Sequence, residues 1–410
     1  MNTGAITLGA LALAVTLGCV TRLNVGLVSI ALAWAIGVYV AGMPVKTVAA
    51  GFPVDLFLTL VGVSLLFSQA SVNGTLQRVA QNAVRLCRGR VGLVPVMFFL
   101  LGAVLGSCGP GNIATTALLA PVAMATAQRL RISPFLMAIM VGNGANASAL
   151  SPLAPTGLIA SGLMEKIGLA GMEGLTWSAN LGAHAVVAFG GYFIFGGLRL
   201  LREGEGAVEV EEIVLERRHW VTLGIIGILV AAVIVARVQI GMAAFAAAVT
   251  LSLLRVADED EAIRKVPWGT IIMVCGVTVL ISLLEKTSGL DLFTGFVARV
   301  ATAGTVVPLM ATLVGLVSAY ASTSGVVLPA FLPMVPGLVA KLGSGNALGL
   351  AETMNVAGHL VDVSPLSTIG ALCIAALPAG EESRRLFNQL LAWGMSMTIV
   401  GAAICWVMFG

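Results

Sequence analysis

The stretch from Gly142 to Gly157, GNGANASALSPLAPTG, lies inside a long apolar run and constrains the fold more than any other. Pro152 and Pro155 remove backbone donors, and each disfavours a helical conformation in the residue before it. If the run lies in a membrane, the carbonyl groups freed in this way need partners other than lipid. Such breaks are tolerated where they line a polar cavity, so the stretch predicts a broken helix beside a binding site. The same break recurs at Val363–Gly370, VSPLSTIG.

Composition predicts that the chain lies in a membrane. Of its 410 residues, 58% are hydrophobic and only 10% are charged, and the mean hydropathy is +1.02. A soluble domain carries about a quarter charged residues. The net charge is only +3 and no basic patch is visible, which excludes the usual nucleic-acid-binding classes. We therefore expect the lipid bilayer as a partner and no nucleic acid.

Hydropathy predicts ten crossings and two hairpins. The crossings are expected at about 4–21, 25–43, 53–70, 134–164, 176–198, 220–236, 239–254, 267–284, 347–377 and 386–409. The fourth and ninth contain the breaks. Residues 93–128 and 305–340 each hold two apolar arms around a polar tip. Each arm of the first region would reach only about 21–24 Å as a helix, short of the roughly 30 Å hydrocarbon core, which predicts re-entrant hairpins.

The distribution of basic residues supports this layout. With residues 71–92 in the cytoplasm, most of the 22 lysines and arginines fall on the cytoplasmic side, as the positive-inside rule requires. Both termini then lie on the external face of the cytoplasmic membrane. Treating either hairpin as a single crossing reverses the orientation of all later segments. The excess of basic residues on the cytoplasmic side is then lost.

An internal repeat relates the two halves at an offset of about 214 residues. Pro53 matches Pro267, Ser107 matches Ser322, and Ser151 matches Ser364. Because each half has an odd number of crossings, the second half must insert upside down. Inverted repeats with broken helices at the midplane are the sequence signature of a secondary transporter.

The predicted fold class is an all-α polytopic membrane protein. It is an inverted repeat of two halves, each of five crossings plus one re-entrant helical hairpin, with broken helices at the site. Residues 1–198 form the first repeat, 199–219 a cytoplasmic linker and 220–410 the second repeat.

The tips and breaks supply the candidate binding residues. Helix N-termini with hydroxyl and amide side chains suit carboxylates, and freed carbonyls suit a hard cation such as Na⁺. A lone serine or threonine in a membrane helix more often bonds its own helix, so the clustering at the breaks is what marks these residues. The candidates for the substrate are Asn112, Thr115, Asn146, Ser322, Thr323, Ser324, His359 and Thr368. The candidates for the cation are Gly111, Asn112, Ser148, Ser151, Ser322, Asp362 and Ser364.

A second signal is the spacing of Glu352, Asn355, His359 and Asp362, which fall within about 80° of one helix face. Ionisable residues at membrane depth usually mark ion or substrate paths. His359 could donate to a substrate carboxylate, and Asp362 could hold a cation or a proton. The alternative for Glu352 is a solvated position at the mouth of an entry path. His184, in an otherwise apolar segment, is expected to be packed rather than functional.

Gly109–Pro121, GPGNIATTALLAP, resembles a hairpin tip of the ion transporter superfamily, in particular divalent anion/sodium symporters and malonate or C4-dicarboxylate carrier-like proteins. The family tip reads Ser-Asn-Thr, of which Asn112 keeps the Asn, and the two Ser-Pro breaks also look like those of the family. The resemblance implies a homodimer of scaffold and transport domains, two Na⁺ sites and elevator-type alternating access. A similar layout occurs in the membrane subunit of binding-protein-dependent carriers, which adds an external binding protein as an alternative partner.

These observations predict a secondary active transporter for a small carboxylate, such as malonate or a C4 dicarboxylate, with Na⁺ or H⁺ as the coupling ion. The alternative within the superfamily is a cation/proton antiporter in which Asp362 and His359 titrate. A membrane enzyme is not expected, because no catalytic motif is recognisable. The inverted hairpins argue against a channel.

Overall fold

The computed structural model describes residues 3–21, 23–84, 90–202, 214–236, 238–343, 346–378 and 380–410. Within these ranges the chain is helical and contains no β-strand. Residues 203–213 of the predicted linker lie outside the described residues, as do four of the 22 lysines and arginines, Arg22, Arg85, Arg88 and Arg237.

The helices of the first half follow the predicted segments closely. They are α1 (Thr3–Val20), α2 (Val25–Tyr39), α3 (Val45–Ala49), α4 (Val54–Val72), α5 (Thr75–Val84), α6 (Leu93–Ser107), α7 (Gly111–Arg129), α8 (Pro134–Ala147), α9 (Pro155–Lys166), α10 (Glu173–Ile194) and α11 (Gly197–Arg202). Helices α8 and α9 are the two parts of the broken segment. Each begins at a proline, which is well accommodated at the first helical position because its missing N–H is not needed there.

The second half has the corresponding elements. They are α12 (Arg217–Ala236), α13 (Ile240–Leu253), α14 (Glu259–Lys265), α15 (Trp268–Lys286), α16 (Gly289–Val300), α17 (Val306–Ser318), η2 (Thr323–Val327), α18 (Leu328–Phe331), η3 (Leu332–Met334), α19 (Val335–Leu342), α20 (Ala347–Val361), α21 (Thr368–Ala375) and α22 (Glu381–Phe409). Four of the described helical runs are long and apolar enough to cross a membrane: Val54–Val72, Trp268–Lys286, Thr323–Leu342 and Glu381–Phe409. Several shorter apolar helices accompany them, as expected of a multi-pass membrane protein.

The return arm after Ser322, the second apolar arm of the hairpin predicted over 305–340, is not one regular α-helix. It runs from Thr323 to Leu342 but consists of a π-helical turn, a short α-helix, a 3₁₀ turn and a final α-helix. Pro329, Pro333 and Pro336 recur through it. Each proline removes one backbone donor from the regular α-helical ladder, so the arm changes its winding along its length.

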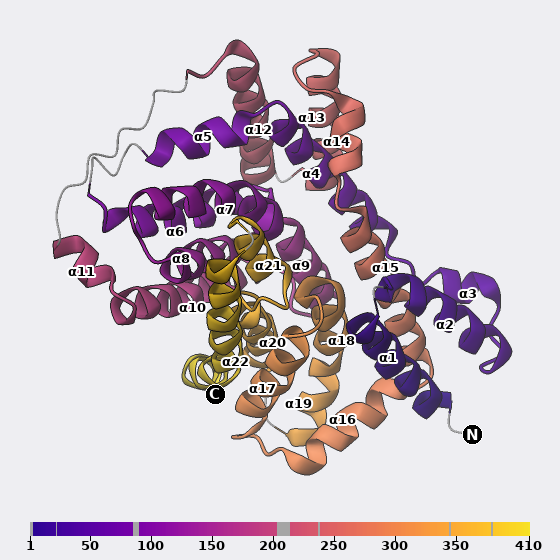
Figure 1. Cartoon of the computed structure of the whole chain (residues 1–410). Helices are drawn as coiled ribbons and strands as arrows, with labels where there is room; N and C mark the ends of the chain where they lie inside the picture. The colour runs from indigo at the N-terminus through magenta and orange to yellow at the C-terminus, as the bar shows by residue number, and fades with distance from the viewer. Residues whose placement is uncertain are drawn as a thin grey trace.

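Packing divides the helices into two groups (Figure 1). In one group, α2 packs along α15 and α4 packs along α13, with α1 and α12 beside them. In the other, α6, α7 and α10 pack on α8, while α17 and α22 pack on α20. We call these the scaffold group and the core group.

Glycines allow the closest approaches inside the scaffold group. A Cβ atom on Gly276 would lie 2.3 Å from the carbonyl oxygen of Gly26, and a Cβ on Gly62 would lie 2.4 Å from that of Gly241. Both neighbours are backbone atoms, which cannot move aside as a side chain could. The two helix pairs are therefore packed backbone to backbone, as small residues permit in membranes.

Candidate functional site

The first hairpin tip connects α6 to α7 through a turn that requires glycine. Gly109 and Gly111 have φ values of +136° and +76°, a region that side chains rarely adopt. A Cβ on Gly109 would also lie 1.9 Å from the ring of Phe67 on α4, so the tip touches the scaffold group. The Ser151 hydroxyl of the first break donates to the Ser107 carbonyl oxygen at 2.7 Å. The break and the tip are thus held together.

Asn112, at the start of α7, joins the tip to the broken helix. Its Nδ2 donates to Oδ1 of Asn146 at 2.9 Å, and its own Oδ1 accepts from the backbone N–H of Ile113 at 3.0 Å. Asn146 in turn donates from Nδ2 to the carbonyl oxygen of His359 at 3.3 Å. Since His359 lies in the second half of the chain, this bond links the two halves at the breaks.

The second tip is fastened to Asp362. The Thr323 hydroxyl donates to Oδ1 of Asp362 at 2.8 Å, and the Ser318 hydroxyl lies 3.4 Å from the same oxygen. Ser318 also donates to the carbonyl oxygen of Gly358 at 2.8 Å. Ser322 caps the return arm by accepting the N–H of Gly325 at 3.1 Å. One carboxylate therefore holds the tip against α20.

His359 is oriented by its own helix. Its Nδ1 lies 2.7 Å from the carbonyl oxygen of Asn355, which can only accept, so Nδ1 carries the proton of this bond. Its Nε2 is buried and has no hydrogen-bond partner. The ring therefore keeps one buried nitrogen, Nε2, available as a hydrogen-bond acceptor.

These groups surround one small cavity of about 100 Å³. Its lining includes Asn112 from the first tip, Ser322, Thr323 and Ser324 from the second, His359 and Asp362 from α20 and its end, and Thr368 from the start of α21. The structure thus brings together seven of the residues that the sequence selected. Asp362 is the one carboxylate among the residues that line this cavity.

The remaining candidates lie outside this lining. Thr115 is buried and its hydroxyl has no hydrogen-bond partner. Asn146 does not line the cavity but accepts a hydrogen bond from Asn112, which does. Ser148 donates to the carbonyl oxygen of Ala145 in its own helix at 2.5 Å, Ser151 bonds Ser107, and the Ser364 hydroxyl accepts the N–H of Leu366 at 3.3 Å. Gly111 lines a neighbouring cleft. The described residues contain no cluster of three or more His, Cys, Asp or Glu side chains that could hold a metal ion.

Two larger clefts lie between the scaffold and core groups. One, of about 380 Å³, is lined by Ser64, Ser68, Lys265 and Pro267 and shares Asn112, Ile113 and Ser324 with the small cavity. The other, of about 540 Å³, is lined by Pro53, Thr278, Ser282 and the three prolines of the return arm. Pro53, Thr278 and Ser282 occupy repeat positions equivalent to Pro267, Ser64 and Ser68.

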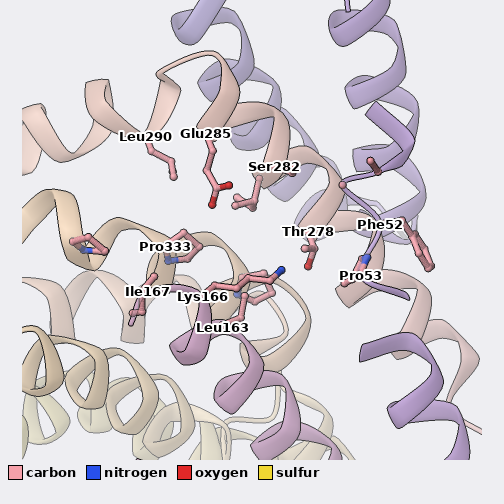
Figure 2. Close-up of a pocket in the computed structure, with 15 residues that line it drawn as sticks. Phe52, Pro53, Leu163, Lys166, Ile167, Thr278, Ser282, Glu285, Leu290 and Pro333 are labelled. Carbon is pink, nitrogen blue, oxygen red and sulfur yellow. The ribbon is translucent and has the colours of Figure 1, made fainter. Parts of the chain in front are cut away.

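Figure 2 shows the second cleft with two charged side chains reaching into it. Lys166 comes from the end of α9 and Glu285 from the end of α15. None of the residues that line this cleft also lines the small cavity. In the described structure, the small cavity therefore adjoins the Lys265 cleft and not the Lys166 cleft.

Sequence reasoning missed part of the polar interior. Thr176 and Asn180 on α10 are buried, and Asn180 donates to the carbonyl oxygen of Asn146 at 2.7 Å. The four-residue spacing of Thr176, Asn180 and His184 on one helix face was the available signal. His184 is buried, as expected, with Nδ1 2.9 Å from Oδ1 of Asn143. Glu352 is not at a solvated mouth, because it is only 1% exposed.

The known proteins that this chain resembles in sequence are transporters. Residues 1–149 match the family model described as the N-terminus of the dicarboxylate carrier protein MatC. Two relatives, the uncharacterized transporters Mb2703 of Mycobacterium bovis and Rv2684 of Mycobacterium tuberculosis, are each 24% identical over 376 residues, covering 86% of this chain and 86% of theirs. The chain is a membrane transporter. It is not an enzyme, since the matching family and relatives are transporters.

The fold of the transporter resembles a solved structure. The crystal structure of the Alcanivorax borkumensis YdaH transporter, described as having an unusual topology, superposes with a TM-score of 0.57. The match covers 88% of this chain and 87% of that one at 15% sequence identity. At this identity the likeness concerns the fold alone, and it extends over both halves of the transporter.

Proposed function

We propose that the transporter moves a small carboxylate, such as malonate or a C4 dicarboxylate, together with a coupling cation. The observation that carries the proposal is the convergence of both tips and α20 on one cavity. Helix N-termini suit a carboxylate because their N–H groups and dipole favour negative charge, and α7 begins at this cavity. The hydroxyl of Ser324 adds a neutral hydrogen-bond donor. The free Nε2 of His359 is an acceptor while Nδ1 carries the proton, so it donates to a carboxylate only when Nε2 is protonated as well.

The coupling cation is expected next to the anion, at Asp362. Its carboxylate is buried and supplies the negative charge that a cation needs. The backbone carbonyls and hydroxyls at the tip supply neutral oxygen ligands of the kind that Na⁺ takes at unwound helix ends. Na⁺ and H⁺ are the two candidates for this ion, and uptake measured under one gradient at a time separates them.

The two-group architecture supports elevator-type alternating access through an inverted repeat. Equivalent helix pairs form the scaffold, and each large cleft separates scaffold from core. In this proposal the core group slides along the scaffold and carries the cavity from one cleft to the other. The Lys265 cleft is the cytoplasmic one, so the described conformation is open to the cytoplasm. The Lys166 cleft is the external one, where Lys166 attracts the anionic substrate.

Two further parts of the proposal come from the family resemblance. The transporter forms a homodimer through its scaffold group, and it lies in the cytoplasmic membrane with both termini outside. A requirement for an external binding protein is the alternative to autonomous uptake, and reconstitution of the chain alone separates the two.

Uptake into proteoliposomes tests the proposal. Purified transporter should accumulate at least one of malonate, succinate and fumarate when an inward Na⁺ or H⁺ gradient is imposed, and not without a gradient. Empty liposomes provide the control. No accumulation of any carboxylate under either gradient would exclude autonomous uptake. Cation-induced proton movement without carboxylate would instead favour the antiporter, for which the pairing of Asp362 with His359 around one cavity is the supporting observation.

A further inference from the structure

The core group contains a second buried carboxyl group, on Glu352 of α20, away from the cavity between the tips. The side chain is 1% exposed. Its Oε1 accepts a hydrogen bond from the Thr176 hydroxyl of α10 at 2.5 Å, and the amide of Asn355 lies within hydrogen-bonding reach of the carboxylate. Its Oε2 has no hydrogen-bond partner. Glu352 is therefore a buried acid, and one of its two carboxylate oxygens has no hydrogen-bond partner.

No basic group compensates this acid. Among the described residues, no lysine, arginine or histidine nitrogen lies within 4.0 Å of its carboxylate. The titratable or charged side chains on its own helix and on the helices that contact it are Glu165, Lys166, Glu173, His184, Tyr192, Lys341, His359, Asp362, Glu381, Glu382, Arg384, Arg385 and Cys405. Of these, Cys405 has an electrostatic interaction with Glu352, and Lys341 is bound to the backbone of Asp291 and the hydroxyl of Thr294. An ionised carboxylate without a counter-ion is costly at such a depth, so this group is stable there as the neutral acid or with a bound cation.

The unused atoms around Glu352 favour a proton. The buried Oδ1 atoms of Asn355 and Asn180, like Oε2 of Glu352, have no partner. All three atoms are acceptors when the acid is ionised. A proton on Oε2 makes that oxygen a hydrogen-bond donor. One of the two asparagine oxygens can then accept its hydrogen bond. Protonation thus satisfies an arrangement that the ionised form leaves open.

A line of polar groups runs from Glu352 to the cavity. Asn355 and His359 follow it on the same face of α20, and His359 lies about 10 Å further along the helix axis. A second row of polar groups starts on α10, where Asn180 follows Thr176 by one turn. Asn180 donates to the carbonyl oxygen of Asn146. The side chain of Asn146 in turn accepts from Asn112 at the tip. The free Nε2 of His359 stands at the end of this line.

The other end of the line approaches the external cleft. Met164 covers the cluster from α9, since its sulfur lies 3.4 Å from Nδ2 of Asn355 and 3.6 Å from the Thr176 hydroxyl. Its neighbours Leu163 and Lys166 line the 540 Å³ cleft of Figure 2. Met164, a flexible side chain, thus contacts the Glu352 cluster from the same end of α9 that lines this cleft.

We propose that Glu352 is a second ion-binding site of the transporter, a carboxyl group that carries one proton in each cycle in addition to the cation expected at Asp362. The inference rests on the proposed function for its role in transport. In each cycle the carboxylate takes one proton from the external side and becomes a carboxylic acid. It then releases that proton toward the cavity and the cytoplasm and returns to the carboxylate, and no other bond changes. Asn355 and His359 on α20 and Asn180 on α10 supply polar groups between Glu352 and the cavity.

The transport test compares two modes of transport in Glu352→Gln, which keeps the size and hydrogen bonds of the neutral acid. Uptake driven by a pH gradient should fall at least about 10-fold, whereas exchange of external for internal carboxylate should fall less than about 3-fold, because exchange moves no net proton. The matched control is Glu165→Gln, at an exposed position beside Met164 and Lys166 at the end of α9. This substitution should change neither gradient-driven uptake nor exchange. Gradient-driven uptake at the wild-type rate in Glu352→Gln would overturn the proposal, as would wild-type uptake that responds to Na⁺ alone.

A second measurement does not depend on transport. Infrared difference spectra of the purified transporter between acidic and alkaline buffer should show the carbonyl band of a buried carboxylic acid. That band should disappear in Glu352→Gln and shift in Glu352→Asp, and Glu165→Gln should leave it in place. If no titrating band depends on residue 352, the proton site is excluded. If the wild type moves no carboxylate but the band behaves as described, the proposed function fails and the proton site stands.

Discussion

Replacing Asp362 with asparagine is expected to lower cation-driven carboxylate uptake by about 100-fold, equivalent to about 2.7 kcal/mol of lost coupling. Asparagine keeps an oxygen that can accept from the hydroxyls of Thr323 and Ser318, so the second tip should remain fastened. What disappears is the negative charge, and Asp362 is the only carboxylate among the residues that line the cavity. A coupling cation would then have only neutral oxygens to bind. Uptake of labelled malonate or succinate in proteoliposomes measures the effect.

The matched control is Asp291→Asn, at an exposed position in the first turn of α16. It removes the same charge from the protein surface and should leave uptake within about 2-fold of the wild type. Wild-type uptake by Asp362→Asn would show that this carboxylate only holds the tip. A loss of both uptake and folding, seen as aggregation on size-exclusion chromatography, would assign it the same structural role.

The second large effect concerns stability. Gly276→Ala should destabilise the scaffold group by about 1–3 kcal/mol, because the added methyl group would lie 2.3 Å from a backbone oxygen of Gly26 and force α2 and α15 apart. Thermal unfolding of the purified transporter should therefore occur several degrees lower. Gly227→Ala provides the control, since Gly227 lies in α12 with open space around its Cβ position. There the same change should raise stability slightly, by about 0.5–1 kcal/mol. Equal unfolding temperatures for the two variants would contradict the backbone-to-backbone packing of α2 on α15.

The helices could be predicted because membrane segments and their breaks are local signals. Pro152 and Pro155 predicted the interruption that the structure has between α8 and α9, and Ser364-Pro365 predicted the one between α20 and α21. The return arm of the second hairpin was harder to predict. Its three prolines, spaced three or four residues apart, give a succession of π, α and 3₁₀ turns rather than one α-helix.

The grouping of residues around the candidate cavity was predictable where they share a helix face or a tip. Ser322, Thr323 and Ser324 follow one another, and His359 and Asp362 are one turn apart, so their joint approach to a cavity follows from local geometry. Ser148 and Ser151 were selected by the same clustering, but their hydroxyls bond nearby carbonyl oxygens, which sequence alone does not reveal. The partnership of Thr176 with Glu352 joins residues that are far apart in the chain. Only the packing of α10 on α20 shows it.

Burial of Glu352 was the least predictable feature. Its place in the second turn of α20 suggested a solvated end, because ionisable residues near helix ends usually reach water. In the structure, Met164 of α9 and Thr176 of α10 contact this turn, and Glu352 is buried beneath them. The enclosure depends on the lengths and tilts of three helices, and none of these is encoded in the pattern around residue 352.

The central claim is that two hairpins enter the membrane from opposite faces and meet at one cavity, and labelling of their bases tests it most directly. In a background with the six native cysteines replaced by serine, single cysteines would be introduced as Arg90→Cys and Ser133→Cys at the base of the first hairpin, and as Ala303→Cys and Ala340→Cys at the base of the second. All four positions are exposed. With a membrane-impermeant maleimide, the first pair should react only from the cytoplasmic side and the second pair only from outside. Reaction of the two members of either pair from opposite sides would show that the segment between them crosses the membrane, and would contradict the account.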